Sequence, residues 1–337
     1  MITEPSHPKG QTSPVTVREA LEGLLDDGPL ASGDRAAALS RMPQGKGNGG
    51  FRYLKHSFGL CRLAWSAPCP ALTKQSERHA HPDGQRYLSS HAARRIGSFA
   101  DGYDFCGSYE DQWIRIGNSV PPLLMRAIAR HLRELDPDPL VPRLSYREAL
   151  SAAWAEHLAP RAADAPTVIS TFAGGGGSSL GYSMAGFREV LAVEWDDNAA
   201  ATLRLNFPHV PLYHGDIAKL SVEEALSTAG LRAGELDVFD GSPPCQGFST
   251  AGKRDFGDSR NQLFREYVRL LRGLRPRVFV MENVSGMVKG GMKLIFADVL
   301  RELKASGYAV KARLLNAMFY GVPQSRERLI FIGTRLQ

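Results

Sequence analysis

The fold follows from the stretch Asp237-Val-Phe-Asp-Gly-Ser-Pro-Pro-Cys-Gln-Gly-Phe-Ser249. Its first half, Leu236 to Asp240, is a short apolar run that ends in Gly-Ser-Pro-Pro, which predicts a buried strand entering a loop. Two prolines stiffen the backbone directly before Cys245, because proline continues neither a strand ladder nor a helix. A thiol held at the carboxyl end of a strand is a candidate nucleophile. An inert buried cysteine is the alternative interpretation.

Two later stretches favour the nucleophile. Arg277-Val-Phe-Val-Met-Glu-Asn-Val284 predicts a second buried strand, and in a parallel sheet it places Glu282 near Cys245 at the same edge. In Gly321-Val-Pro-Gln-Ser-Arg-Glu-Arg-Leu-Ile-Phe-Ile-Gly333, alternating residues on one face are Gln324, Arg326 and Arg328. A thiol, a carboxylate and two guanidiniums in one cleft indicate attack on an electron-poor ring beside phosphate.

From Thr167 onward, predicted strands and helices alternate, which predicts an α/β fold with a doubly wound, mostly parallel sheet. The expected strands lie near residues 167–172, 189–195, 210–215, 236–240, 277–282, 309–315 and 328–333. The first strand leads into a glycine turn and a helix start, Ala173-Gly-Gly-Gly-Gly-Ser-Ser-Leu-Gly181. Ser179 breaks the pattern G-x-G-x-x-G, so no pyrophosphate is required. The glycines still let the backbone approach a ligand closely.

The ends of the next two strands carry residues suited to a nucleoside. Glu194 stands where an acid accepts hydrogen bonds from ribose hydroxyls in doubly wound folds. Trp195 beside it can pack on an adenine face. At the third strand end, Asp216 can accept from an adenine amino group and Ile217 can contact the ring. Any nucleotide-binding fold remains the broader alternative.

The composition is that of an ordinary globular protein. With 337 residues and a net charge of +6, the chain can form one large and one small domain, and it permits a polyanionic partner. The four cysteines include no C-x-x-C pair, so neither a zinc site nor a disulfide framework is predicted. No apolar run is long enough to span a bilayer. We therefore expect a soluble, cytoplasmic protein without metal.

The N-terminal half is less regular. Residues 1–14 are rich in Pro, Ser and Gly and predict a loose tail. Gln44 to His56 is glycine-rich, then basic and aromatic, which suits a loop that meets phosphates and base edges, and we expect residues 47–56 to face the DNA groove. A solvated loop with Phe51 and Tyr53 packed inward is the alternative. Residues 136–166 predict a linker that contains one helix, Ser145 to Leu158.

Here the motifs resemble a known family. Ser-Pro-Pro-Cys-Gln, Glu-Asn-Val and Gln-Ser-Arg-Glu-Arg are similar to the catalytic motifs of the DNA (cytosine-5)-methyltransferases. The resemblance covers nearly the whole chain, but the segments that end the family's usual sequence stand before its first motif here. Residues 81–105 and 112–122 resemble segments that normally close the family's sequence, so a circular permutation is implied. His91 and Ala251 depart from the residues usual at their positions, an acidic residue and a serine.

The resemblance implies a division into domains. We expect a small target-recognition domain in residues 1–110 and a cofactor-contacting segment with its helix in 111–135. A linker in 136–166 and a catalytic domain in 167–337 follow.

The resemblance also implies three groups of site residues and no metal. Catalytic roles fall to Cys245, Glu282, Arg326, Arg328, Asn283 and Pro244. S-adenosylmethionine, with S-adenosylhomocysteine as product, would be bound by Phe172, Gly174, Gly176, Glu194, Trp195, Asp216, Ile217, Leu263, Asn118, Ser119 and Val120. Double-stranded DNA would be contacted by Gln246, Ala251, Lys253, Arg254, Gln324, Arg52, Tyr53 and Lys55.

In the implied reaction, the Cys245 thiolate adds to carbon 6 of a flipped-out cytosine, and carbon 5 then attacks the methyl group. Glu282 protonates ring N3, so it must carry a proton, which burial favours. The implied protein is a monomeric modification enzyme of a prokaryotic restriction system. Alternatives are a tRNA cytosine-5 methyltransferase, a catalytically inactive DNA-binding relative, and a half-enzyme that needs a second subunit.

Overall fold

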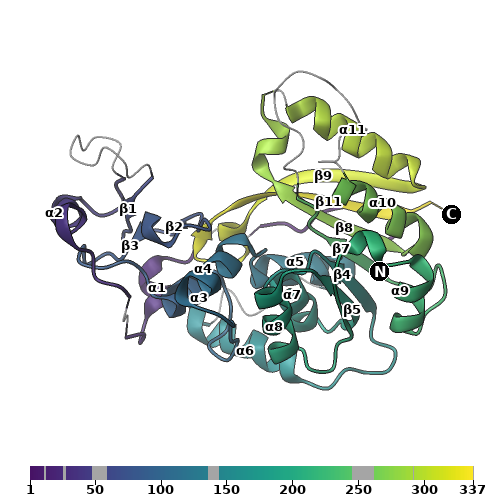
Figure 1. The fold of residues 1–337 in the computed structure, drawn as a ribbon, viewed down its shortest axis with the longest axis horizontal. Coiled ribbons are helices and arrows are strands. Elements are labelled where there is room, and N and C mark those ends of the chain that lie inside the picture. The colour runs from purple at the N-terminus through teal and green to yellow at the C-terminus, as the bar shows by residue number, and fades with distance from the viewer. Residues whose placement is uncertain are drawn as a thin grey trace.

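The computed structural model describes residues 1–10, 13–25, 28–47, 59–135, 144–244, 262–290 and 292–336. Its centre is a seven-stranded sheet in the order β6-β5-β4-β7-β8-β11-β9 (Figure 1). The strands are β4 (Thr167–Thr171), β5 (Arg188–Glu194), β6 (Leu212–His214), β7 (Val238–Gly241), β8 (Val278–Val284), β9 (Tyr308–Asn316) and β11 (Glu327–Arg335). The first five in this spatial order are parallel, and β11 runs antiparallel to β8 and β9. The predicted α/β fold with a mostly parallel sheet is confirmed.

Two hydrophobic cores lie on opposite faces of the sheet, because successive strand side chains point to opposite sides. In β7, Val238 faces the first core and Phe239 the second. The first core is covered by α5 (Pro122–Leu132), α6 (Tyr146–Leu158), α7 (Gly177–Met184) and α8 (Asp197–Asn206). The second is covered by α9 (Val222–Ala229), α10 (Gln262–Leu274) and α11 (Met292–Ala305).

Much of the N-terminal half packs into the first core. It contains α1 (Val17–Leu21), α2 (Gly33–Arg41), α3 (Ser90–Ile96) and α4 (Tyr109–Asn118), of which α1, α3 and α4 contribute buried side chains there. Short strands β1 (Cys61–Arg62) and β3 (His79–Ala80) pair with each other, and β2 (Cys69–Pro70) pairs with β10 (Gln324–Ser325). A small separate cluster consists of Leu39, Met42, Leu60, Ala80 and Tyr87. It belongs to the part that lies away from the large sheet in Figure 1.

Short 3-10 helices connect several of these elements. They are η1 (Ser76–Arg78), η2 (Ile217–Lys219), η4 (Ser285–Val288) and η5 (Ala317–Tyr320). None of the helices in the described ranges combines the length and apolar character needed to cross a membrane.

The N-terminal residues are bound to the catalytic half. The Ile2 amide donates to the Leu132 carbonyl at 2.9 Å, His7 Nε2 lies 2.9 Å from the Ile330 carbonyl, and the Tyr320 hydroxyl donates to Pro8 O. The prediction of a loose tail is therefore wrong for residues 1–10. Its polar composition carried no sign of these contacts, which depend on groups more than a hundred residues away.

The helices α5 and α7 approach each other closely at Gly181. A Cβ atom on Gly181 would lie 2.5 Å from Met125 Cβ and 2.6 Å from the Pro122 carbonyl oxygen. The backbone of α5 therefore occupies the space that any other side chain at residue 181 would need.

We expect Gly181→Ala to lower the free energy of unfolding by about 1–3 kcal/mol, because the added methyl overpacks a backbone contact that cannot shift locally. Urea denaturation followed by circular dichroism measures this. Gly286→Ala is the matched control, since its Cβ would meet nothing within 4 Å. Equal losses in the two variants would mean that the α5–α7 approach is not tightly packed.

Candidate active site

A cavity of about 1040 Å³ opens at the carboxyl ends of the parallel strands. Ligand sites of doubly wound sheets lie at this edge. Fifteen residues singled out from the sequence line it: Asn118, Ser119, Val120, Phe172, Gly174, Glu194, Trp195, Asp216, Ile217, Pro244, Leu263, Glu282, Asn283, Arg326 and Arg328. The structure thus brings residues 118–120 beside the glycine turn at 172–177, although the linker separates them in sequence.

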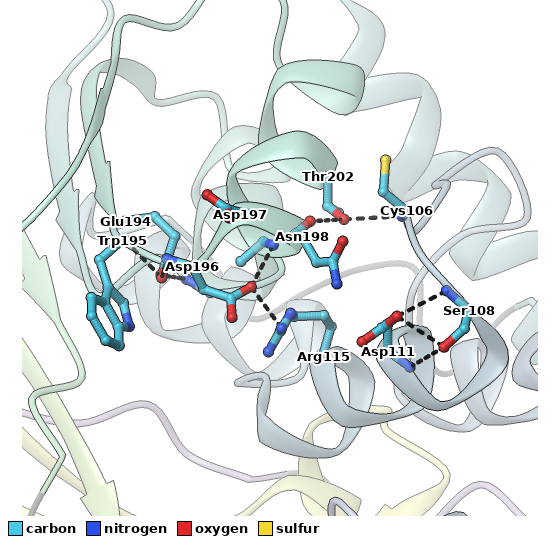
Figure 2. Close-up of polar contacts among 12 residues, drawn as sticks. Cys106, Ser108, Asp111, Arg115, Glu194, Trp195, Asp196, Asp197, Asn198 and Thr202 are labelled. Atoms are coloured by element: carbon cyan, nitrogen blue, oxygen red, sulfur yellow. Dashed lines mark hydrogen bonds and ion pairs between the residues drawn. The ribbon is translucent and has the colours of Figure 1, made fainter.

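Glu194 ties two strand ends together at this cavity. Its carboxylate accepts hydrogen bonds from the Gly174 amide at 2.6 Å and from the Trp195 and Asp196 amides at 2.9 Å each. Carboxylate oxygens have about four acceptor positions, so one remains for a ligand hydroxyl. The Trp195 side chain is 77% exposed, which leaves its indole face open to a planar ligand (Figure 2).

The glycines of the turn serve two purposes. Gly174 has φ +55° and lines the cavity, with only Phe172 O within 4 Å of its would-be Cβ. Gly176 instead packs against the Tyr103 hydroxyl, which donates to Gly175 O at 2.7 Å. Gly174 thus leaves its backbone open to the cavity, whereas Gly176 makes room for Tyr103.

The segment that contains Cys106 and Arg115 contacts α8 and the residue just before it, as Figure 2 shows. Arg115 Nη2 lies 2.6 Å from Asp196 Oδ1, and Asp196 also accepts from the Ala199 amide at the helix start. The Cys106 amide donates to Thr202 Oγ1 at 3.1 Å. Arg115 lines the cavity and was not predicted. Its place three residues before Asn118, in the segment that resembles the family's closing motif, was the signal that could have found it.

A carboxylate and a guanidinium face each other deeper in the cavity. Glu282 lies in β8 and Arg328 in β11, and Arg328 Nε is 2.6 Å from Glu282 Oε1. This contact fixes the position of the Glu282 carboxyl group. Asn283 Nδ2 donates to the Pro243 carbonyl at 3.2 Å, which fixes the proline turn to β8.

Several predicted site residues lie outside the described ranges. These are the expected nucleophile Cys245 and the expected DNA-contacting residues Gln246, Ala251, Lys253, Arg254, Arg52, Tyr53 and Lys55.

Arg326 and Gln324 hold a segment of the N-terminal half. Arg326, 3% exposed, donates from Nη1 to the Leu72 carbonyl at 2.7 Å and from Nη2 to the Gly117 carbonyl at 2.8 Å. Gln324 Oε1 accepts from the Leu72 amide at 3.0 Å. Burial, with the nearby Arg328 charge, lowers the pKa of Arg326 to about 9.

Gln324 is almost fully buried. It is 2% exposed, and its amide oxygen is bound by the protein's own backbone at Leu72. Its expected contact with DNA stays a prediction. In the described part of the chain, no group of three or more His, Cys, Asp or Glu side chains is arranged to hold a metal ion.

Comparison with known proteins gives one family. Residues 31–134 and 166–337 match the family model described as C-5 cytosine-specific DNA methylase. The chain is 42% identical over 178 residues to the Type II methyltransferase M.AquIA of Picosynechococcus sp., which covers 50% of this chain and 72% of that one.

Two further relatives are similar over a comparable stretch. Identity is 42% over 172 residues, or 50% of this chain, both to M.XorII of Xanthomonas oryzae pv. oryzae and to M1.HphI of Haemophilus parahaemolyticus. The matches span 41% and 46% of those two Type II methyltransferases. The chain therefore spans less than half of their length.

We expect Arg326→Lys to lower the free energy of unfolding by about 1–3 kcal/mol, because one ammonium group cannot satisfy two separated buried carbonyls. Because lysine keeps the positive charge, the change tests only the two hydrogen bonds from the guanidinium to the Leu72 and Gly117 carbonyls. Arg301→Lys serves as the control, since Arg301 makes one ion pair on the surface with Asp298. Urea denaturation of both variants measures the free energy of unfolding. Equal values for the two variants would mean that the paired hydrogen bonds of Arg326 do not stabilise the fold.

Proposed function

The chain belongs to the C-5 cytosine-specific DNA methylase family, and we propose that it transfers a methyl group from S-adenosylmethionine to carbon 5 of cytosine in DNA. The observation that carries the proposal is the shared cavity. Glu194 and Trp195 at one end, and the Glu282–Arg328 pair at the other, open into the same space. A nucleoside-bearing methyl donor and a pyrimidine ring can therefore meet there.

The cavity residues fit such a donor. A volume of about 1040 Å³ accommodates a nucleoside with an amino-acid side arm and a base beside it. Glu194 would accept from one ribose hydroxyl, Trp195 and Ile217 would pack on the adenine, and Asp216 would accept from its amino group. Asn118 and Ser119 would bind the polar amino-acid end. When bound, S-adenosylmethionine supplies the methyl group.

The protein's part of the reaction is addition, protonation and elimination. The Cys245 thiolate would form a bond to cytosine carbon 6, and the ring electrons would move toward carbon 5 as Glu282 gives a proton to N3. Arg328 would keep Glu282 oriented through the contact described above. Carbon 5 then takes the methyl group, and loss of its proton expels the Cys245 thiolate.

The proposed substrate is a specific sequence in duplex DNA, as part of a restriction-modification system. The relatives named above are Type II methyltransferases. A base inside a duplex must be flipped out to reach such a cavity, at a cost of roughly a few kcal/mol. The net charge of +6 suits a polyanionic partner.

We also infer that the chain is a circular permutant of its family, with the domain division proposed from the sequence. The inference is supported by the position of residues 118–120 against the glycine turn. The family match in two segments, residues 31–134 and 166–337, is compatible with it. Permutation is physically tolerable where domain termini lie at the surface.

The covalent step can be trapped. Duplex DNA made with 5-fluorocytosine lacks the proton whose loss releases the enzyme, so with S-adenosylmethionine it should give a denaturant-resistant complex. Cys245→Ser should give none and should lose methyl transfer while still binding DNA. Denaturing gels and incorporation of labelled methyl groups measure both.

Cys106→Ser is the matched control and should be trapped like the wild type. Methyl transfer by Cys245→Ser at the wild-type rate would eliminate the mechanism. Methyl labelling of tRNA and not of duplex DNA would identify tRNA as the substrate. Bisulfite sequencing of DNA from expressing cells would identify the recognised site.

The proposed contact of residues 118–120 with the cofactor can be tested separately. We expect Asn118→Ala to raise the dissociation constant of S-adenosylhomocysteine about tenfold, since one lost hydrogen bond to a charged group costs about 1.5–3 kcal/mol. Asn198→Ala is the control, because Asn198 lies on neighbouring α8 without lining the cavity. Titration calorimetry measures both constants. An unchanged constant in Asn118→Ala would contradict the proposed contact between Asn118 and the cofactor.

A further inference from the structure

The positive charge of the chain is concentrated in one segment. Residues 31–86 contain nine Lys and Arg but only three Asp and Glu, so this segment alone accounts for the net charge of +6. The rest of the chain holds equal numbers of basic and acidic residues. Such an asymmetry is typical of a protein that binds a polyanion through one part of its surface.

Two of the three acids in this segment are already paired with arginine. Glu77 forms an ion pair with Arg35, and Asp83 Oδ2 lies 3.0 Å from Arg86 Nε. The third, Asp34, lies in the first turn of α2. The acids of the segment therefore neutralise few of its other cations.

Two of those cations, Lys74 and Arg78, line a cavity of about 450 Å³. Neither forms an ion pair with another residue in the described ranges. The Arg78 side chain lies over Gly59, where a Cβ atom would be 3.5 Å from Arg78 Cδ and Nε. Gly59 follows closely after His56, which ends the segment expected to face the DNA groove. The cavity thus adjoins that segment in the sequence.

Three further charged side chains line this cavity. Arg35 and Glu77 neutralise each other in their ion pair. Glu110 lies in the first turn of α4, where the helix dipole stabilises a carboxylate. Lys74 and Arg78 therefore leave the cavity with an excess of positive charge, which suits an anion.

The backbone that carries Lys74 is held in place. Arg326 donates to the Leu72 carbonyl, as described above, and Trp113 Nε1 donates to the Thr73 carbonyl at 2.9 Å. Lys74 follows directly. A cation on a fixed backbone loses less conformational freedom when it binds a ligand than one on a loose loop.

Helix α4 lines both this cavity and the candidate active site. Trp113 and Ile114 face the cavity, whereas Arg115 and Asn118 line the candidate active site. Because a helix with its side chains is about 10–12 Å across, the two spaces lie roughly that far apart. Phosphates on one strand of duplex DNA follow each other about every 3.4 Å along the axis. A duplex with one base in the active site therefore has phosphates at this distance within about four base pairs.

We propose that Lys74 and Arg78 form an anchor for a backbone phosphate of duplex DNA. This inference rests on the proposed function, in which a cytosine of the same duplex enters the active site. The contact is ionic and independent of base sequence, because a phosphate carries no sequence information. The anchor holds the duplex against the segment that Arg326 ties to the active site.

The anchor can be tested with Lys74→Gln combined with Arg78→Gln. Fluorescence anisotropy measures the Kd of a labelled duplex of mixed sequence, about 30 base pairs long, at several KCl concentrations. Loss of one phosphate contact should lower the slope of log Kd against log salt concentration by about 0.9. At 100 mM KCl this corresponds to binding that is about eightfold weaker.

Arg301→Gln combined with Lys304→Gln is the matched control. Both residues are exposed near the end of α11, which leads to Tyr308 at the edge of the sheet away from Arg328. The control removes the same charge from the chain, so it separates the anchor from a general effect of net charge. Its salt slope should equal that of the wild type.

Methyl transfer provides a second measurement. With unmethylated bacterial genomic DNA, the variant of Lys74 and Arg78 should raise the KM for DNA and leave kcat unchanged, because the phosphate contact is the same before and during the reaction. A role in folding alone would change the free energy of unfolding without changing the salt slope.

The outcomes separate this inference from the proposed function. An unchanged salt slope in the variant of Lys74 and Arg78, or an equal fall in the control, would overturn the anchor. If that variant does not fold, Lys74→Gln alone, at an exposed position, should still lower the slope, and an unchanged slope would again count against the anchor. Wild-type protein that transfers no methyl group to duplex DNA would overturn the proposed function instead.

Discussion

The close approach of α5 to α7 is the constraint on which the rest of the structure depends. Gly181 leaves room for the α5 backbone at Pro122, and this contact fixes where the preceding residues 118–120 can lie. They meet the glycine turn at the carboxyl end of β4, where the cavity opens. A larger side chain at residue 181 would therefore disturb both the core and one wall of the candidate site, because the same backbone segment forms both.

The fold was largely predictable because buried strands leave a strong local pattern. Strands expected near 167–172, 189–195 and 309–315 are found at Thr167–Thr171, Arg188–Glu194 and Tyr308–Asn316. What the pattern does not encode is direction, so the antiparallel course of β11 could not be read from its apolar run. Nor does composition reveal long-range partners. Ser6, for example, lies 2.8 Å from His131 through its hydroxyl, in a segment whose residues alone predicted a loose tail.

The candidate site was predictable where chemistry and strand ends coincide, as at Glu194 and Glu282. The site was not predictable where a residue from a functional motif instead stabilises the protein's own packing. Gln324 belongs to a motif that suggested contact with a nucleic acid, yet its amide oxygen binds Leu72 N. Arg115 was missed because an isolated arginine on a helix is usually solvated, and only its nearness to Asn118 in the sequence hinted at the contact with Asp196.

Arg326, which lies between β10 and β11 and two residues before Arg328, holds the N-terminal half. Arg326 binds carbonyls at Leu72 and Gly117, and two residues later Arg328 binds Glu282. Only Glu327 separates Arg326 from Arg328, so a displacement of the segment around Leu72 must move the guanidinium beside Glu282 or break buried hydrogen bonds. The contacts from Leu72 to Arg326 and from Arg328 to Glu282 are thus joined by a single residue, so a shift of the segment around Leu72 would be passed on to the Glu282 carboxyl group.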